Sequence, residues 1–210
     1  MALAVQPEAF INDVVEREVG KGGVSPLELA RRIEEETHEY GEGVEQEVAS
    51  YVAALRSLNR QEAQTVIHPL SDGVGGQWDG TQIEIAARTV QVERGGLEET
   101  IARMRGVGEH EALHARGGHH LIEGPETVRV GEVTLTKEEA IEGYVVGKTD
   151  DRFVSPDYKR YKSNVQRAIA TSRRVTLKDF ERALNEKHNL WLIDESRSTE
   201  EMGENLRKAA

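Results

Sequence analysis

The stretch GEHEALHARGGHHLIEG, from Gly108 to Gly124, holds four of the seven histidines in the chain. Within it, HEALH places His110 and His114 four residues apart. On a helix, this spacing puts both imidazoles on one face, one turn apart, where they can bind the same metal ion. Because the chain has no cysteine, any further protein ligand must be histidine, aspartate or glutamate. We therefore expect this stretch to begin as a metal-binding helix.

Glu111 lies directly after the first of these histidines and is expected not to bind the ion itself. From this position its carboxylate can accept a proton from a metal-bound water and later pass it to a leaving amine. Zinc with three protein ligands lowers the pKa of its water to about 7, which suits hydrolysis at neutral pH. The motif therefore predicts a zinc-dependent metallopeptidase, with Glu111 as the general base.

The residues before the motif predict a strand followed by a helix. Apolar side chains recur at helical spacing from Leu97 to His114, so we expect one helix with a buried face. Farther upstream, the stretch Thr81 to Arg88 begins by alternating polar and apolar residues. This alternation is typical of a half-buried strand, and we place that strand at the edge of a sheet.

A strand followed by HEALH on a helix resembles the zincin metallopeptidases. The resemblance implies an α+β fold in which a small mixed sheet packs on the active-site helix, with further helices before and after. It also implies that the predicted edge strand, Thr81 to Arg88, lines the cleft and pairs with an extended substrate. Zn²⁺ would then be the cofactor, and the partner would be a peptide or protein substrate.

Two residues are candidates for the third zinc ligand. The stretch HEALHARGGHH is similar to the longer metzincin pattern, in which Gly117 turns the chain so that His120 reaches the ion. Alternatively, EEAIEGYVV resembles the glutamate helix of the gluzincins, and Glu142 has the position of the ligand. Metzincins also share a methionine turn, but the only methionine after the motif, Met202, lies in a polar stretch. We therefore prefer Glu142 and keep His120 as the alternative.

Peptide hydrolysis passes through an oxyanion, which needs a hydrogen-bond donor near the metal. We expect Tyr144, which follows the Glu-Gly pair of the gluzincin-like segment, to be this catalytic donor. Tyr158, Tyr161 and His188 are alternatives. The segment departs from the thermolysin-like pattern at Val146, where those enzymes have an acidic residue, so the orientation of the histidine ligands must come from elsewhere.

The chain divides by pattern into three parts. Residues 1–62 are predicted to form a helical segment, which includes a capping sequence, SPLE, at Ser25. Residues 63–194 are predicted to form the zincin-like catalytic domain, and residues 195–210 a polar tail. The helical segment has no place in a minimal zincin core. We expect it to pack on the catalytic domain, or to act as a pro-segment or inhibitory cap.

The composition limits the partners. No apolar run approaches the roughly 20 residues that a membrane span needs, so we expect no membrane partner. The net charge of −11 argues against nucleic acid, whose binding depends on clustered basic residues. The absence of a signal peptide and of cysteine predicts a cytoplasmic protein. The sequence does not predict an oligomeric state.

Two other functions remain open. The chain could be a non-catalytic protein that keeps a zincin-like fold for binding or as a scaffold, although the presence of Glu111 argues against this. It could also be a metal-dependent hydrolase that acts on a substrate other than a peptide, because no specificity pocket can be inferred from residue spacing.

Overall fold

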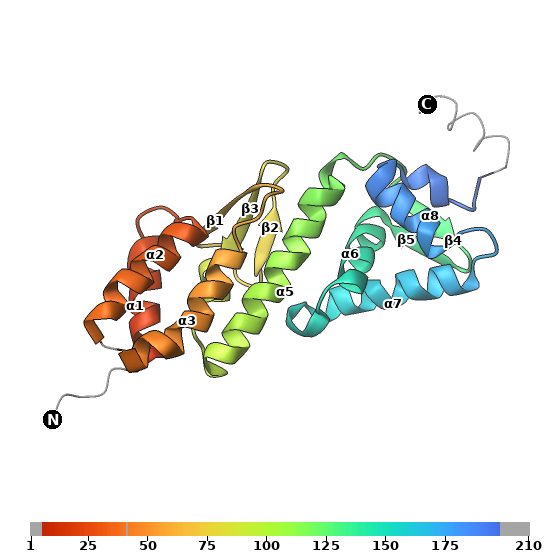
Figure 1. Ribbon diagram of the computed structural model, residues 1–210. Coiled ribbons are helices and arrows are strands. Elements are labelled where there is room, and N and C mark those ends of the chain that lie inside the picture. The colour runs from red at the N-terminus through yellow and green to blue at the C-terminus, as the bar shows by residue number, and fades with distance from the viewer. Residues whose placement is uncertain (1–5, 41, 198–210) are drawn as a thin grey trace. The chain divides into compact units, whose positions relative to one another are not determined.

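The computed structural model describes residues 6–40 and 42–197 and has a mixed α+β architecture, as the sequence predicts (Figure 1). The described chain divides into two compact units, residues 1–115 and 116–210, with the boundary near the end of helix α5 (Gly96–Gly117). From residue 198 on, the predicted polar tail lies outside the described residues. Among the described helices, none is long and apolar enough to cross a membrane.

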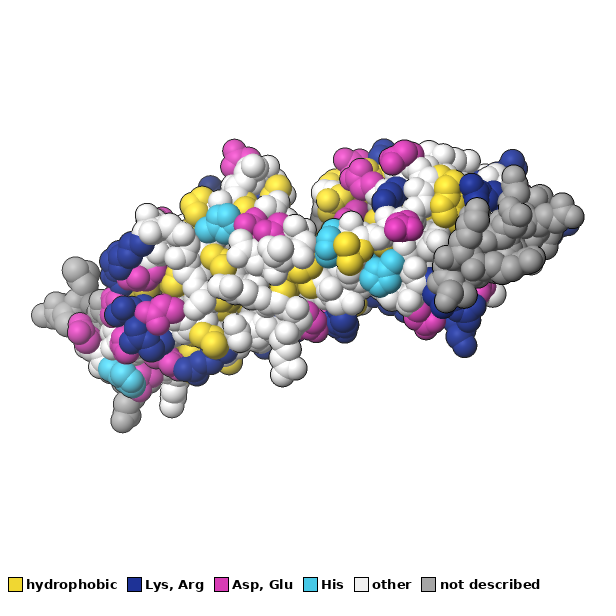
Figure 2. Space-filling model, turned by 90° about the horizontal axis from the view of Figure 1, so that it is seen from above, with side chains coloured by type: hydrophobic (Ala, Val, Ile, Leu, Met, Phe, Trp, Pro, Cys, Tyr) yellow, Lys and Arg dark blue, Asp and Glu magenta, His cyan; other side chains and the backbone are white. Residues whose placement is uncertain are grey.

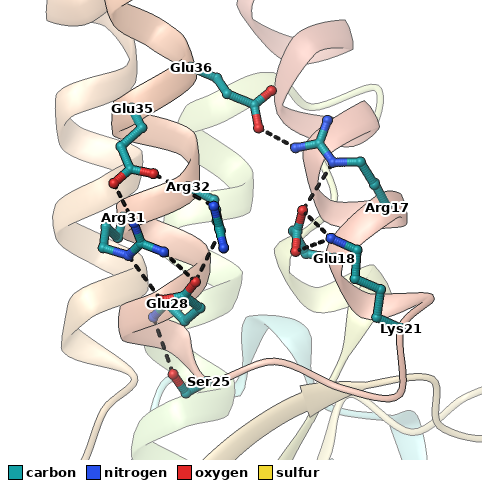
Figure 3. A network of polar contacts seen from close by, with 9 residues as sticks. All are labelled: Arg17, Glu18, Lys21, Ser25, Glu28, Arg31, Arg32, Glu35 and Glu36. Carbon is teal, nitrogen blue, oxygen red and sulfur yellow. Dashed lines mark hydrogen bonds and ion pairs between the residues drawn. The ribbon is translucent and has the colours of Figure 1, made fainter.

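Three helices open the first unit: α1 (Pro7–Val19), α2 (Pro26–Thr37) and α3 (Glu42–Ser57). The helices predicted from sequence periodicity in this region are confirmed. Ser25 caps α2 by accepting the backbone N–H of Glu28 at 3.2 Å, as expected. The carboxylate of Glu28, predicted to complete a capping box, instead accepts from Arg31 and Arg32 (Figure 3).

Ion pairs join the three helices at their surface. Arg17 of α1 pairs with its neighbour Glu18 and with Glu36 of α2 (Figure 3). Arg56 of α3 pairs with Glu34 of α2. On the face that Figure 2 shows, acidic and basic side chains of this unit lie next to one another. Because exposed pairs contribute little to stability, we interpret the pairs between helices, Arg17–Glu36 and Arg56–Glu34, as part of a solvated surface.

The sheet of the first unit has three strands, in the order β1 (Gln64–His68), β3 (Gln82–Ala86), β2 (Gly76–Trp78). Strand β1 is parallel to β3 and β2 is antiparallel to it, so the sheet is mixed, as expected. The predicted strand within Thr81 to Arg88 exists as β3, but its expected place at the sheet edge is wrong. It is the central strand, because β2 pairs along its other side.

The helices and the sheet of the first unit share one hydrophobic core. Each of α1, α2, α3, β1, β3 and α5 contributes fully buried side chains to it, for example Ile11, Leu29, Leu55, Ile67, Ile85 and Met104. The hydroxyl of Tyr51 donates to the carbonyl of Val90 at 2.6 Å, at the end of the short helix α4 (Ala87–Val90). The first three helices therefore bury their apolar faces in the same core as the sheet.

The second unit contains a two-stranded hairpin and several helices: β4 (Thr127–Val130), β5 (Val133–Thr136), α6 (Lys137–Lys148), α7 (Pro156–Thr171) and α8 (Leu177–Glu181). The stretch EEAIEGYVV, expected to be helical from its resemblance to the gluzincin glutamate helix, lies on α6. Thr136 and Glu139 form a capping box at the start of α6. Helices α6 and α7 pack closely at Gly143, where an added Cβ would lie 2.5 Å from the carbonyl oxygen of Tyr161.

Candidate metal site

Helix α5 carries the HEALH motif near its C-terminal end. The predicted apolar stripe of this helix faces the core of the first unit: Met104 is fully buried, and Leu97, Ile101 and Val107 are packed partly buried against it. This packing fixes the rotation of the helix about its axis. The directions in which the motif side chains leave the helix are therefore set by the core.

His110 and His114 approach each other closely on this helix. Their Nε2 atoms lie 3.1 Å apart, and each residue is 7% exposed. With Zn–N bonds of about 2.0–2.1 Å, two ligands at a tetrahedral angle lie about 3.3–3.4 Å apart. The two nitrogens are therefore already close to the separation that one bound ion requires, and the predicted pairing of these residues is present.

Glu111 is buried between the histidine positions, at 6% exposure. Its side chain lies against strand β2, because a Cβ added to Gly76 would lie 3.0 Å from Cγ of Glu111 and 2.8 Å from Val107. The edge strand of the sheet therefore runs beside the predicted general base. Strand β2 therefore has the edge position that was expected for β3.

A tight turn after β2 sets the pairing of this edge strand. Oδ1 of Asp79 accepts the backbone N–H groups of Gln82 and Thr81, both at 2.7 Å. These bonds, that from Gln82 foremost, lower the pKa of Asp79 below its ordinary value. At the other end of the strand, the carbonyl of Gly75 accepts the hydroxyl of Thr89 at 2.7 Å. The short strand is thus anchored at both ends.

The chain turns sharply after α5, but one residue later than expected. Gly117 is still the last residue of the helix, and Gly118 adopts the left-handed conformation, with φ of 56°. His119 follows, buried, with its Nε2 3.2 Å from Oδ1 of Asn185. His120, the alternative third ligand, is exposed.

Helix α6 carries Glu142, half-buried, and Tyr144, which is 7% exposed. Residues two apart on a helix leave it about 200° apart, so these two side chains leave α6 on opposite sides. The hydroxyl of Tyr144 accepts the side-chain N–H of Asn185 at 2.8 Å, and burial raises its pKa. The predicted catalytic role of Tyr144 stays a prediction, although its position on α6 argues against it if Glu142 faces an ion.

The other candidate oxyanion donors belong to the second unit. Tyr158 and Tyr161 lie on α7 with ring centroids 5.8 Å apart. His188, with φ of 49°, is the one non-glycine residue of positive φ among those described. Such strain is often found at functional sites. Asn185, which the sequence analysis did not single out, lies in a π-helical turn (Arg182–Glu186), a feature that is also frequent at such sites.

His110, His114 and Glu142 offer two imidazole nitrogens and one carboxylate oxygen, a group that could hold a metal ion. His120 does not belong to this group. Such a donor set suits zinc, but other divalent transition metals accept the same donors, so it does not identify the metal.

Comparisons with known proteins give no match: no family model, no curated protein and no solved structure is similar to this chain. The function must therefore be argued from the chemistry of the site.

Proposed function

We propose that the chain is a zinc-dependent metallopeptidase with a zincin-like fold. The observation that carries this proposal is the 3.1 Å separation of the His110 and His114 Nε2 atoms, with Glu111 buried between these positions on the same helix. Two histidine nitrogens at this distance offer a pair of donors to one metal ion. An adjacent buried carboxylate that need not bind the ion provides the proton acceptor that hydrolysis requires.

In the proposed mechanism, zinc supplies Lewis acidity toward the substrate carbonyl and the attacking water when it is bound. Glu111 accepts the proton of the attacking water and then donates it to the leaving amine. The close approach of Gly76 to Cγ of Glu111 limits the space open to this side chain before substrate binds. This restriction is expected to favour catalysis, because a catalytic group that is already oriented loses little entropy in the reaction.

We propose Glu142 as the third ligand. Its support is the donor chemistry of the group that includes it and the position of Glu142 in the gluzincin-like Glu-Gly segment. The capping box at Thr136 stabilises the start of the helix that carries Glu142. His120 remains the alternative, and its exposure makes it the weaker one.

The proposed substrate is an extended peptide that pairs with β2. This strand is at one edge of the sheet and is antiparallel to β3, with Glu111 beside it. Pairing of a peptide with a strand edge supplies main-chain hydrogen bonds that do not depend on sequence. We propose a cytoplasmic location and a peptide or protein as the partner.

The experiment that tests the function is cleavage of a mixed peptide library, with and without a metal chelator. The proposal predicts cleavage that the chelator abolishes and that added zinc restores. A chain that binds zinc but cleaves no peptide would contradict it. That result would favour one of the alternatives, a non-catalytic binding protein or a hydrolase of another substrate.

A further inference from the structure

A second candidate site lies wholly within the second unit. A cavity of about 650 Å³ is lined by the turn between β4 and β5, the segment after α7 and the last described residues of the chain. None of the candidate metal ligands lines it. Three of its lining residues are arginines: Arg173, Arg174 and Arg197.

Neutral groups hold the carboxylate of Glu195, which also lines the cavity. Its two oxygens accept the backbone N–H of Gly131 at 2.7 Å, the hydroxyl of Ser172 at 2.5 Å and the backbone N–H of Arg174 at 3.1 Å. Burial by itself raises the pKa of Glu195, but these bonds and, to a smaller extent, the charge of Arg174 lower it overall, so the group is ionised at neutral pH. Its charge is thus stabilised mainly by hydrogen bonds from neutral groups.

The guanidinium N–H groups of the three arginines are therefore not used to bind Glu195. Among the described residues, none of the three forms an ion pair with a carboxylate. The cavity lining holds three arginines against two glutamates, Glu132 and Glu195, although the whole chain has a net charge of −11. The local excess of positive charge is therefore not a consequence of a generally basic chain.

One of the arginines is also held in place. The guanidinium carbon of Arg197 lies 3.2 Å from the centroid of the Trp191 ring, which is the stacked geometry of a cation–π contact. Stacking uses the face of the guanidinium and leaves its N–H edges for an acceptor. A ligand that binds these edges has less side-chain entropy to remove than one that binds a fully mobile arginine.

We propose that this cavity binds a phosphate-bearing ligand through Arg173, Arg174 and Arg197. The planar fork of a guanidinium matches two phosphate oxygens, and a phosphate has enough oxygens for more than one fork. A carboxylate, with two oxygens, has fewer acceptor positions for three arginines. The proposal does not depend on the proposed peptidase activity.

The test is calorimetric titration of the full chain with inorganic pyrophosphate, at constant ionic strength. We expect saturable binding that weakens roughly tenfold or more in the variant R173Q/R174Q, because two charge-assisted contacts are lost. The matched control is R152Q/R160Q, which removes the same charge from two exposed arginines of the same unit outside the cavity. Circular dichroism checks that every variant is folded.

A second readout reports on the cavity directly. Trp191 is one of two tryptophans, so the substitution Trp78→Phe leaves it as the sole indole fluorophore. We expect pyrophosphate to change the Trp191 fluorescence in this background, and R197Q to abolish the change. Absence of saturable binding, or equal weakening in R152Q/R160Q and R173Q/R174Q, would overturn the proposal. Equal weakening would mean that only long-range attraction of an anion is present.

Discussion

The Nε2 atoms of His110 and His114 lie 3.1 Å apart on successive turns of α5, while another side of the same helix is buried in the core of the first unit. The packing that stabilises the fold therefore also orients the two imidazoles. Binding of an ion between them needs little rearrangement of the helix, which favours affinity because few groups must be ordered on binding.

The first prediction concerns the general base. Glu111→Gln is expected to keep the metal and to lower peptide turnover by roughly 10²- to 10⁴-fold, because the amide keeps the shape and loses the proton acceptor. The matched control is Glu109→Gln on the same helix, whose carboxylate pairs with Arg60 at 3.4 Å. Steady-state kinetics with bound metal quantified in parallel would check this. Turnover by Glu111→Gln equal to that of the control would refute the mechanism.

The second prediction concerns the edge strand. Gly76→Ala places a Cβ 2.8 Å from Val107 and 3.0 Å from Cγ of Glu111, so β2 or the helix must move. We expect a loss of about 1–3 kcal/mol of unfolding free energy and a marked loss of turnover. Gly43→Ala, where an added Cβ meets nothing within 4 Å, is the control and should lose neither. Chemical denaturation and kinetics measure both, and unchanged values for Gly76→Ala would contradict the packing described here.

The sequence could predict the helices of this protein because their signals are local. Helical periodicity and caps at Ser25, Thr136 and Ser155 are contained within one or two turns. Strand β2 gave no such signal, since it has three residues in a glycine-rich stretch and exists only because β3 pairs with it. Because β2 was not predicted, the strand within Thr81 to Arg88 was wrongly expected at the edge of the sheet.

Much of the candidate site could likewise be predicted from HEALH, because residues four apart on a helix share a face. Asn185 could not. It contacts His119 and Tyr144, which are 66 and 41 residues away in the chain, so its role depends on tertiary packing alone. The closeness of Gly76 to Glu111 could not be predicted either, because the two residues are far apart in the sequence.

The third prediction concerns pH. The folded protein holds the pKa of Glu195 below its ordinary value of 4.5, so its ionised form stabilises the fold above that value. This contribution is lost as the pH falls through the lowered pKa. Thermal melting of the protein and of Glu195→Gln at several pH values should show a difference in Tm that is largest near neutrality and shrinks in acid. A difference that does not vary with pH would contradict the prediction.

The fourth prediction concerns the helical segment at residues 1–62. Because α1, α2 and α3 bury their apolar faces in the same core as the sheet, deletion should expose that core and give an unfolded or insoluble product. Solubility and circular dichroism of residues 63–210 would check this. A folded remainder with higher peptidase activity would show instead that the segment is an inhibitory cap.

The most direct test of the central claim is the zinc content of the purified chain, measured by elemental analysis for the wild type and for single variants. We predict about one zinc per chain in the wild type and in His120→Ala, and loss of stoichiometric zinc in His114→Ala and Glu142→Ala. Circular dichroism of each variant separates loss of the ion from loss of the fold. Full zinc content in a folded Glu142→Ala, with loss in His120→Ala, would contradict the proposed ligand set, and absence of bound zinc from the wild type after exposure to excess zinc would contradict the proposed function itself.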